Sequence, residues 1–427
     1  MPTSAVRERP ESWFPPRVEP ARLALGAALA TAGFLLAWAV LHEGFYARYV
    51  IVDTPIYQDY GERMAAGELP YRDFRVEYPP GALPAFVLPA LTLDRSSAPE
   101  RYVRRFEWLM AACGTAALIL MAMSLLSLRA DGRRAAAALG FAALAPLALG
   151  SVILSRFDLW PAALAAGALA AFLHGRDRLG SGVLGLAVVA KLYPAVLVPL
   201  AAAWIWRRRG RGEALVCGGI LAAVVALAFV PFLVLAPGGV AESLGHQLSR
   251  PLQVESLGAA GLFALRNLFG LGLELRSGHG SQNLAGALPT AVGLAQSLVQ
   301  IGVLVWIWRA FACGPPERER LVRYSAAAVL AFVALGKVLS PQFLIWLLPF
   351  VPLVGGRRGL AASALLGLAL VLTQLWFPFR YWDFALRFDE TSAWLVLARD
   401  VVLAACLAVL VWPVSRGSPP KGVTTSN

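Results

Sequence analysis

The residues best suited to do chemistry in this chain gather in one polar stretch, residues 50–81, which follows the first apolar run. Its acidic and tyrosine side chains of interest are Asp53, Tyr57, Asp59, Tyr60, Tyr71, Asp73, Glu77 and Tyr78. A carboxylate held against a hydroxyl group can remove its proton, and such general-base catalysis contributes roughly 10²–10⁴-fold to a rate. Tyrosines beside that carboxylate would shape a pocket for a sugar.

Asp53 is the preferred base within this stretch. It comes soonest after the first apolar run, and Pro55 restricts the backbone directly after it. The competing interpretation is a solvated loop whose acids face water, and any one of these acids taken alone fits it.

A second pattern occurs three times and places a cation shortly before a proline. Lysine is rare in this chain, with three copies among 38 basic residues, so the two lysines inside apolar runs stand out. The three copies are Arg156-Phe-Asp158-Leu-Trp-Pro161, Lys191-Leu-Tyr193-Pro194 and Lys337-Val-Leu-Ser-Pro341. Proline is favoured in the first turn of a helix, and a helix N-terminus attracts anions. Three such ends, with Arg156, Lys191 and Lys337 beside them, would suit a lipid phosphate.

A cation without a partner in the apolar layer costs at least about 3 kcal/mol, so each of these three needs one. The alternatives to phosphate binding are snorkelling of the side chain to the lipid head groups, or an ion pair between Arg156 and Asp158.

A later polar segment offers His246-Gln247, Arg250, Glu255-Ser256 and Arg266-Asn267. Groups of both signs suit a sugar or a phosphate, although an ordinary interfacial loop would look the same. Residues 379–383 (Phe-Arg-Tyr-Trp-Asp) are most simply an aromatic belt segment at the membrane surface.

The sequence lacks the common motifs for nucleotides and metals. It has no Asp-x-Asp pair, no Gly-rich phosphate loop and no His-Glu-x-x-His, and its four histidines are scattered. We therefore expect no metal site and no cofactor, and a substrate that is carried by a lipid.

The elements that must position these residues are membrane helices. Hydrophobic residues make up 58% of the 427-residue chain and charged residues 15%, against about 25% in soluble proteins. The mean hydropathy of +0.63 and the long apolar runs exclude a soluble enzyme, a disordered chain and a disulfide scaffold. We predict an all-α polytopic membrane protein of about twelve transmembrane or re-entrant helices. Their ranges are 21–41, 104–128, 133–153, 159–173, 180–190, 195–206, 214–235, 286–308, 323–338, 341–354, 360–377 and 393–412.

Two pairs of these segments are too short to cross separately. We interpret 180–206 and 323–354 as helices broken around Lys191–Pro194 and Lys337–Pro341, which membranes tolerate where the backbone lines a cavity or is buried. Residues 80–94 carry three prolines and are predicted to be juxtamembrane or re-entrant.

The distribution of Lys and Arg predicts the orientation. With residues 1–20 in the cytoplasm, the inner loops hold 21 basic and 8 acidic residues, and the outer segments hold 16 and 17. Arg399 and Asp400 lie within the last span and cancel. The net charge of +12 is therefore a topology signal, and we expect no nucleic-acid partner. A single transmembrane domain is predicted over 21–413, with long outer loops at 42–103 and 236–285 and a disordered cytoplasmic tail over 414–427.

Taken in order, these motifs resemble the polyprenyl-phosphate-sugar-dependent glycosyltransferases of the membrane type C fold, most closely glycosyltransferase family 87. The resemblance covers about residues 50–350, and the order and spacing of its short motifs are more specific than any one of them. It rests on Asp53, Gly67 to Tyr71, Glu77-Tyr78-Pro79-Pro80, Arg156 to Pro161, Lys191 to Pro194, Arg250 to Ser256, and Lys337 to Phe343.

This resemblance implies a hexosyltransferase of cell envelope biosynthesis, in the cell membrane, with its site on the extracytoplasmic side. The donor would be a polyprenyl phosphate sugar such as polyprenyl-phosphate-mannose, the acceptor a glycolipid or glycan, and the transfer inverting. Asp53 would be the general base, with Asp59, Asp73 and Glu77 open as alternatives because no acidic pair marks it. The expected substrate-binding residues are Tyr57, Tyr71, Glu77, Tyr78, Arg156, Asp158, Lys191, Tyr193, Arg250, Glu255, Lys337 and Gln342. A flippase or transporter of lipid-linked sugars, or a membrane scaffold, is the alternative, and the carboxylate-rich outer loop favours an enzyme.

Overall fold

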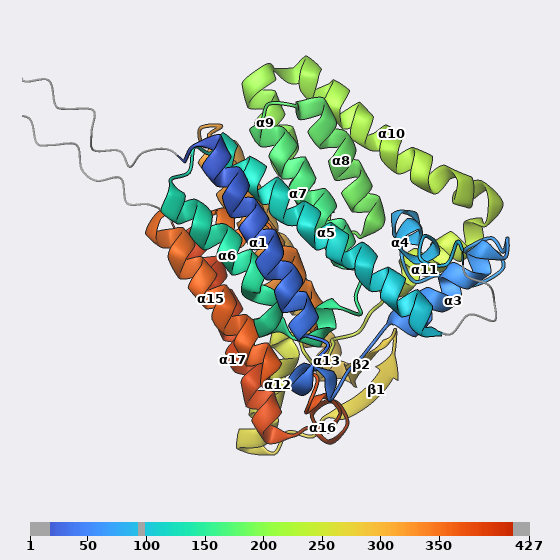
Figure 1. The fold of residues 1–427 in the computed structure, drawn as a ribbon. Helices are drawn as coiled ribbons and strands as arrows, with labels where there is room; N and C mark the ends of the chain where they lie inside the picture. Colours follow the sequence, from blue (N-terminus) through green and yellow to red (C-terminus); the bar gives the residue numbers. More distant parts are fainter. Residues whose placement is uncertain (1–17, 93–98, 413–427) are drawn as a thin grey trace, which may run out of the picture.

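The computed structural model describes residues 18–92 and 99–412, and nearly all of its regular structure is helical (Figure 1). Among the described residues, six helices are long and apolar enough to cross a membrane. They are α1 (Pro20–Val40), α5 (Pro99–Ser127), α10 (Arg211–Leu235), α13 (Ala287–Ala312), α15 (Gly356–Gln374) and α17 (Glu390–Val411). The predicted all-α, multi-pass membrane protein is confirmed, whereas a count of about twelve crossings is not established.

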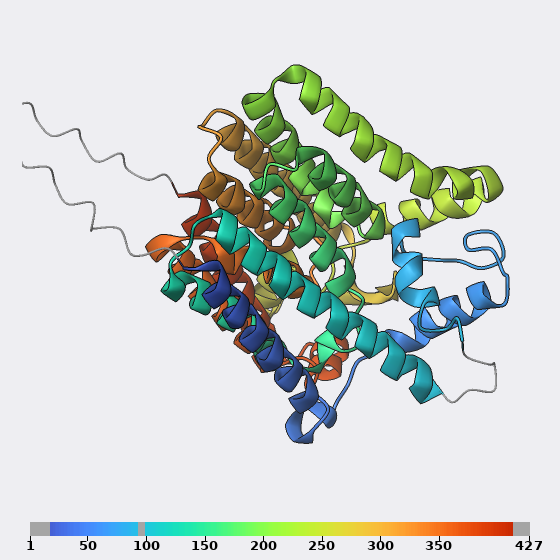
Figure 2. The same ribbon diagram turned by 45° about the horizontal axis from the view of Figure 1, so that its top comes forward.

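Five more predicted segments form shorter or less apolar helices within the bundle. They are α6 (Gly132–Leu149), α7 (Leu159–Leu173), α8 (Asp177–Ala190), α9 (Val198–Arg209) and α14 (Arg318–Ala334). Helix α7 is apolar on all sides, which is typical of a buried helix, and it packs between α5 and α8. Helix α10 lies along the edge of the bundle and buries almost nothing, so its apolar surface is left for lipid (Figure 2).

The two predicted breaks are confirmed, but the segments after them are not simple half-helices. Helix α8 ends at Ala190, and the 3₁₀ helix η4 (Tyr193–Leu197) leads into α9. After α14 the chain forms two 3₁₀ helices, η5 (Pro341–Leu347) and η6 (Val351–Leu353), where we predicted a helix over 341–354. Prolines 341, 349 and 352 explain this difference, because each lacks the N–H that an α-helix uses.

The first outer segment consists of short helices. They are α2 (Gly44–Ala47), α3 (Thr54–Ala65), η2 (Pro80–Ala82) and α4 (Leu83–Val87). The five residues of α4 cannot span a membrane, in agreement with the prediction that 80–94 does not cross. Gly81 anchors this segment against the end of α8, where a Cβ would come within 2.6 Å of the Val189 carbonyl carbon.

The second outer segment contains an element that we did not predict. The segment begins with α11 (Pro237–Leu248) and α12 (Leu257–Phe269). Between α12 and α13 it forms an antiparallel hairpin of β1 (Glu274–Gly278) and β2 (Ser281–Ala285). The two residues of its turn, His279 and Gly280, have φ values of 57° and 62°, as in a type I′ turn. Two further short elements are η3 (Ser151–Ile153), between α6 and α7, and α16 (Tyr381–Arg387), before α17.

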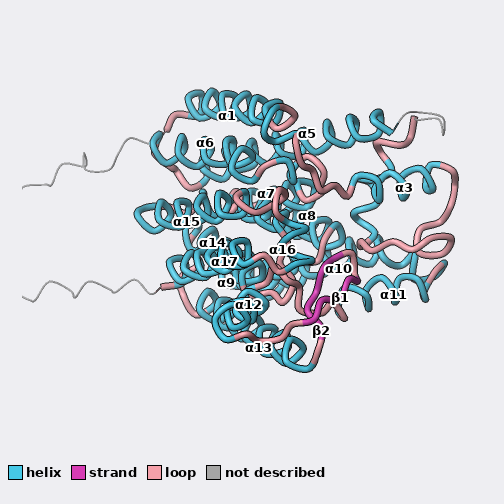
Figure 3. The backbone as a smooth tube through the Cα atoms, turned by 90° about the horizontal axis from the view of Figure 1, so that it is seen from below, coloured by secondary structure: helices cyan, strands magenta, loops and turns pink. Residues whose placement is uncertain are grey.

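The two outer segments meet at one end of the bundle, where α3, α11 and the hairpin lie together (Figure 3). The ends of the described chain lie at the opposite end. There the Val18 N–H donates to the Ala130 carbonyl at 3.2 Å, and Arg358 Nη2 donates to the Trp412 carbonyl at 2.7 Å. Most of the predicted cytoplasmic segment (1–17) and the predicted tail (414–427) fall outside the described residues.

Candidate active site

A cavity of about 390 Å³ lies at the end of the bundle where the outer segments meet. It is lined by residues from the first outer segment, from the turn before α7, from residues 250–255, from the hairpin and from the start of η5. Five of the predicted site residues line it: Asp53, Arg156, Arg250, Glu255 and Gln342. These residues are far apart in the sequence, so the fold concentrates polar chemistry at this one place.

Asp53 is the residue directly before α3, and its carboxylate forms an ion pair with the Arg156 guanidinium. The Tyr57 hydroxyl, one turn further along α3, lies 3.4 Å from Asp53 Oδ2. Both residues line the cavity, but the Asp53 side chain is 24% exposed and that of Arg156 is 7% exposed, so the carboxylate is the more accessible part of the pair. The alternative ion pair between Arg156 and Asp158 is wrong, because Arg156 binds Asp53 instead.

The other acids left open as the base do not line the cavity. Asp73 accepts hydrogen bonds from Arg72 Nε at 2.9 Å and from the Leu69 N–H at 2.7 Å, and these bonds lower the pKa of Asp73 to about 2. Glu77 lies 3.9 Å from His246 Nε2, and Asp59 is absent from the lining. Of the four carboxylates considered, Asp53 alone lines the cavity.

Residues 250–256 form one wall of the cavity. Glu255 is 1% exposed, and the Gln253 side-chain amide donates a hydrogen bond to Glu255 Oε2. Burial raises the pKa of the Glu255 carboxyl to about 7, although Arg399, Gln253, Arg156 and Arg250 act in the opposite direction. Arg250 Nη2 donates to Ser281 Oγ of the hairpin at 3.2 Å, and within the described residues Arg250 has no carboxylate partner.

Lys191 lies beside the cavity in a closed polar and aromatic environment. Its Nζ donates to Asp158 Oδ1 at 2.6 Å, and the Trp346 indole N–H donates to the same oxygen at 2.6 Å. The ammonium lies 4.5 Å from the centre of the Phe157 ring and 5.1 Å from that of Trp346, and Tyr193 stacks on Trp346 at 4.2 Å. Lys191, Asp158 and Tyr193 therefore support the cavity wall without lining it.

Lys337 lies on the other side, in the turn between α14 and η5. Its Nζ donates to the Leu248 carbonyl at 3.4 Å, and within the described residues it has no carboxylate partner. Its own carbonyl accepts the Gln253 N–H at 3.0 Å, which ties this turn to the wall formed by 250–256. Gln342 lines the cavity and accepts a hydrogen bond from Ser340 Oγ at 2.5 Å.

The predicted tyrosines pack beneath the site instead of facing it. Tyr57 stacks on Phe86 at 4.6 Å, and Tyr78 meets the Phe157 ring edge-to-face at 4.9 Å. The Tyr71 hydroxyl donates to the Tyr78 carbonyl at 2.6 Å. This aromatic cluster supports Asp53 and the Arg156–Asp158 turn from below.

The helix-end argument for anion binding is only partly supported. Pro161 is the third residue of α7, as expected for a helix start, but Pro194 and Pro341 lie in the first turns of short 3₁₀ helices. A macrodipole needs many aligned peptide units, so η4 and η5 contribute little to binding an anion.

Several residues that line the cavity were missed. Tyr381 and Trp382, predicted as a membrane belt, line the cavity, as do Gln253, Phe343 and the hairpin turn. The Gly-His-Gly sequence at 278–280 was a usable signal for the hairpin. Nothing in the local sequence shows that Tyr381 would reach a cavity that is also lined by Asp53 and Arg156, which come more than 200 positions earlier.

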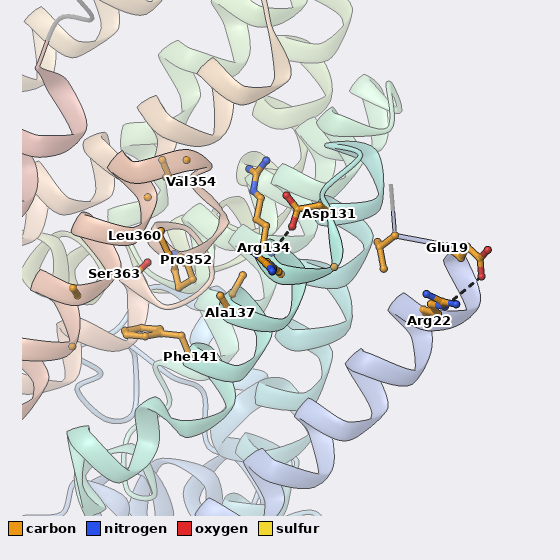
Figure 4. Close-up of a pocket in the computed structure, with 18 residues that line it drawn as sticks. Glu19, Arg22, Asp131, Arg134, Ala137, Phe141, Pro352, Val354, Leu360 and Ser363 are labelled. Atoms are coloured by element: carbon orange, nitrogen blue, oxygen red, sulfur yellow. Dashed lines mark hydrogen bonds and ion pairs between the residues drawn. The ribbon is translucent and has the colours of Figure 1, made fainter. Parts of the chain in front are cut away.

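A larger cavity of about 1170 Å³ lies at the opposite end, between the starts of α1, α6 and α15 (Figure 4). Its two acids have local roles: Glu19 lies 3.6 Å from Arg22 Nε, and Asp131 accepts the Arg134 N–H at the start of α6. The rest of its lining is mainly apolar. Among the described residues no three His, Cys, Asp or Glu side chains are grouped to hold a metal ion.

Comparisons with known proteins place the chain in a family. The model of glycosyltransferase family 87 matches residues 77–341, which include Arg156, Lys191, Arg250, Glu255 and Lys337 and begin after Asp53. No curated protein matches. Among solved structures, the crystal structure of ArnT from Cupriavidus metallidurans bound to undecaprenyl phosphate is similar, with a TM-score of 0.48, 14% identity, and coverage of 92% of this chain and 77% of that chain. Because the family model matches more than half of the sequence, the chain belongs to glycosyltransferase family 87, a family of membrane glycosyltransferases.

Proposed function

We propose that this glycosyltransferase moves a hexose, with mannose as the first candidate, from a polyprenyl phosphate to an acceptor hydroxyl, with inversion and with Asp53 as the general base. One observation carries the proposal. One cavity, at the end of the bundle where the two predicted outer segments meet, holds the Asp53 carboxylate together with the cation Arg250, and Lys337 is joined to the same wall.

The arrangement of charge suggests where the donor phosphate binds. Arg156 and Lys191 already have carboxylate partners, so we assign the phosphate to Lys337, the remaining cation of the repeated pattern, together with Arg250. Arg–phosphate contacts are commonly bidentate, and lysine supplies a point charge. A volume of about 390 Å³ falls within the 300–1,000 Å³ range of ligand pockets, which suits one hexose and its phosphate while the prenyl chain lies between helices in the bilayer.

The chemistry then follows from the positions of these groups. The hydroxyl oxygen of the acceptor attacks the anomeric carbon, and Asp53 accepts the proton of that hydroxyl. The bond from that carbon to the phosphate oxygen breaks on the opposite face, which inverts the configuration. Arg250 and Lys337 stabilise the charge left on the departing phosphate, so no acid catalyst is needed. The ion pair with Arg156 holds the Asp53 carboxylate in place for the attack.

The distribution of arginines supports an extracytoplasmic site. The turns rich in arginine, at 129–134, 207–211 and 357–358, precede or follow the helix ends remote from the cavity. Under the positive-inside rule this remote end is cytoplasmic, with both termini, and the cavity opens to the extracytoplasmic side. A donor and a glycolipid or glycan acceptor of the cell envelope would meet there.

Transfer by purified protein tests this proposal. Protein in nanodiscs is incubated with radiolabelled polyprenyl-phosphate hexoses and membrane lipids as acceptors. We expect Asp53→Asn to lower the rate by roughly 10²-fold or more, because the general base is lost while the shape of the side chain is kept, and to leave donor affinity within about threefold. Thermal unfolding of Asp53→Asn in detergent checks that the fold survives.

Full activity of Asp53→Asn would refute the assigned base. Movement of the labelled lipid across the membrane without sugar transfer would favour a flippase over the proposed enzyme.

A further inference from the structure

Two charged residues lie fully buried in the middle of the last membrane helix, α17. Arg399 and Asp400 are both 0% exposed, and Arg399 Nε lies 2.6 Å from Asp400 Oδ1. Adjacent residues of opposite charge can cancel, which explains how the bilayer tolerates them. Ionisable residues at membrane depth are nevertheless expensive and usually mark a function, so the contacts of this pair are informative.

Arg399 reaches from α17 to the wall of the candidate site. Its Nη2 donates a hydrogen bond to the backbone carbonyl of Glu255 at 2.7 Å. Asp400 neutralises the Arg399 guanidinium. The centre of the Trp376 ring lies 5.8 Å from the Cζ atom of Arg399. The guanidinium therefore lies directly behind the segment that carries Gln253 and Glu255 into the cavity.

That segment is held on several sides by its backbone. The Gln253 N–H donates to the Lys337 carbonyl at 3.0 Å, and the Val254 N–H donates to the Gln282 carbonyl of the hairpin at 3.1 Å. Ser256, the N-cap of α12, donates its hydroxyl to the Gln253 carbonyl at 2.8 Å. Arg399 is the charged contact in this set, so it influences the charge of the wall as well as its position.

Two acceptor atoms of the wall have no hydrogen-bond partner. Gln253 and Glu255 are 2% and 1% exposed, both line the cavity, and within the described residues neither Gln253 Oε1 nor Glu255 Oε1 is bonded. Buried acceptors without donors are costly, so a native site of this kind is expected to meet a donor on its ligand. The hydroxyl groups of a sugar are such donors, and a phosphate at neutral pH is not.

We propose that Gln253 and Glu255 form a subsite for the sugar hydroxyls of the donor, and that Arg399 is the positioning residue that keeps this subsite in place and negatively charged. This inference rests on the proposed function. It assigns the phosphate to Arg250 and Lys337 and the sugar ring to the wall in front of α17. The buried charge pair then has a role that mere cancellation would not require.

The charge of Glu255 provides a specific readout. Burial raises its pKa to about 7, while Arg399, Arg156 and Arg250 favour the ionised form and Tyr381 also faces it. Without the Arg399 guanidinium the pKa of Glu255 should rise further, so that at pH 7 the carboxyl is more often protonated and accepts fewer hydroxyl hydrogen bonds. The acidic limb of the pH profile of kcat/KM should therefore move to higher pH.

The experiment is a double-mutant cycle with Arg399→Met, Glu255→Gln and the double variant, measured with the radiolabelled polyprenyl-phosphate hexose. We expect Arg399→Met to raise the KM for the donor about tenfold at pH 7, which corresponds to about 1.4 kcal/mol, to shift the acidic limb upward, and to be partly rescued by Arg399→Lys. In the Glu255→Gln background the same substitution should move no pH limb, because the carboxylate is gone. It should also raise KM clearly less than in the wild type, since only the hydrogen bond from Arg399 to the backbone carbonyl of residue 255 is then lost.

Controls separate this role from a purely structural one. The variant Arg399→Met/Asp400→Leu removes both buried charges, which often leaves stability unchanged, and it should show the same KM and pH effects as Arg399→Met. Equal effects of Arg399→Met with and without Glu255, or an unmoved pH profile, would overturn the inference. If Glu255→Gln transfers sugar too slowly to assay, the same variants are made in the Asp53→Asn protein and their donor affinities are measured instead.

A wild-type protein that transfers no sugar would count against the proposed function. Transfer with independent effects of Arg399 and Glu255 would count against the subsite alone.

Discussion

The breaks at Lys191 and at Lys337 share one sequence pattern and have different surroundings. In both, a lysine ends an apolar run and a proline follows within four residues. Lys191 is bonded to Asp158 and enclosed by the rings of Phe157 and Trp346. Lys337 contacts the Leu248 carbonyl at 3.4 Å and, among the described residues, has no acid beside it.

This difference shows that the pattern alone does not decide whether a cation is structural or available to a ligand. The partner of Lys191 lies 33 positions earlier, at the start of α7, and Trp346 comes from η5. Inside a bilayer a paired cation is a structural part of the core, because separating the pair exposes each charge to a medium of low dielectric constant. Lys337 has no carboxylate partner among the described residues, and it is joined to the cavity wall through its own carbonyl, which accepts the Gln253 N–H.

The strongest test of this comparison is to break the buried pair. Asp158→Asn leaves Lys191 without its carboxylate, and loss of one partner of a buried pair typically costs about 3–5 kcal/mol. We therefore expect a large fall in the thermal unfolding temperature in detergent. The same measurement on Lys337→Met should show a change of no more than about 0.5 kcal/mol, as at a site outside the core.

The double variant Lys191→Met/Asp158→Leu separates loss of the ion pair from the cost of an unpaired buried charge. It should be more stable than Asp158→Asn, because no unpaired charge is left. Equal stability of Asp158→Asn and Lys337→Met would remove the distinction between the two breaks.

A smaller effect is expected for substitutions of Lys337, and it concerns donor affinity. Lys337→Met should weaken donor affinity about tenfold, since a hydrogen bond to a charged group contributes about 1.5–3 kcal/mol. Lys337→Arg keeps the charge and should lose much less. Equilibrium binding of a polyprenyl phosphate to protein in nanodiscs measures both, and unchanged binding in Lys337→Met would exclude this lysine from the phosphate site.

The smallest effect is expected at an acid of the first outer segment that lies away from the cavity. Asp73→Asn should change the transfer rate less than about twofold, as is usual for exposed positions. The pKa of Asp73 is lowered to about 2, so its ionised form is favoured at all pH values above that, and any contribution to stability is lost only as the pH falls toward 2. Between pH 5 and 9 its titration should leave no trace in the pH profile, which makes it the matched control for Asp53→Asn.

Much of the helical framework was predictable. The predicted ranges 21–41, 159–173 and 214–235 lie within a few residues of α1, α7 and α10. Such helices are readable because a bilayer crossing demands a long apolar run whatever its neighbours are. The breaks at Lys191 and Lys337 were readable for the same reason, since a cation and a proline inside such a run cannot both be accommodated in a continuous helix.

Other features depended on distant parts of the chain. The hairpin is a small polar element whose only local signal is its Gly-His-Gly turn. The apolar pattern predicted a helix over 341–354, but the prolines in this segment lead to 3₁₀ helices instead. Arg399 and Asp400 were correctly paired from sequence, but the hydrogen bond from Arg399 to Glu255 crosses 144 positions and has no sequence signature.

The sequence by itself determined that this protein is a mainly helical membrane protein with two long polar segments, and it supplied the candidate acids and cations for a site. The tertiary structure decided which of these groups meet: Asp53 with Arg156, Lys191 with Asp158, and Arg250 with the hairpin. The physical reason is that hydrophobicity acts on each segment separately and can be summed along the chain. Pairing of buried charges depends on distances of a few ångströms between segments that only packing brings together.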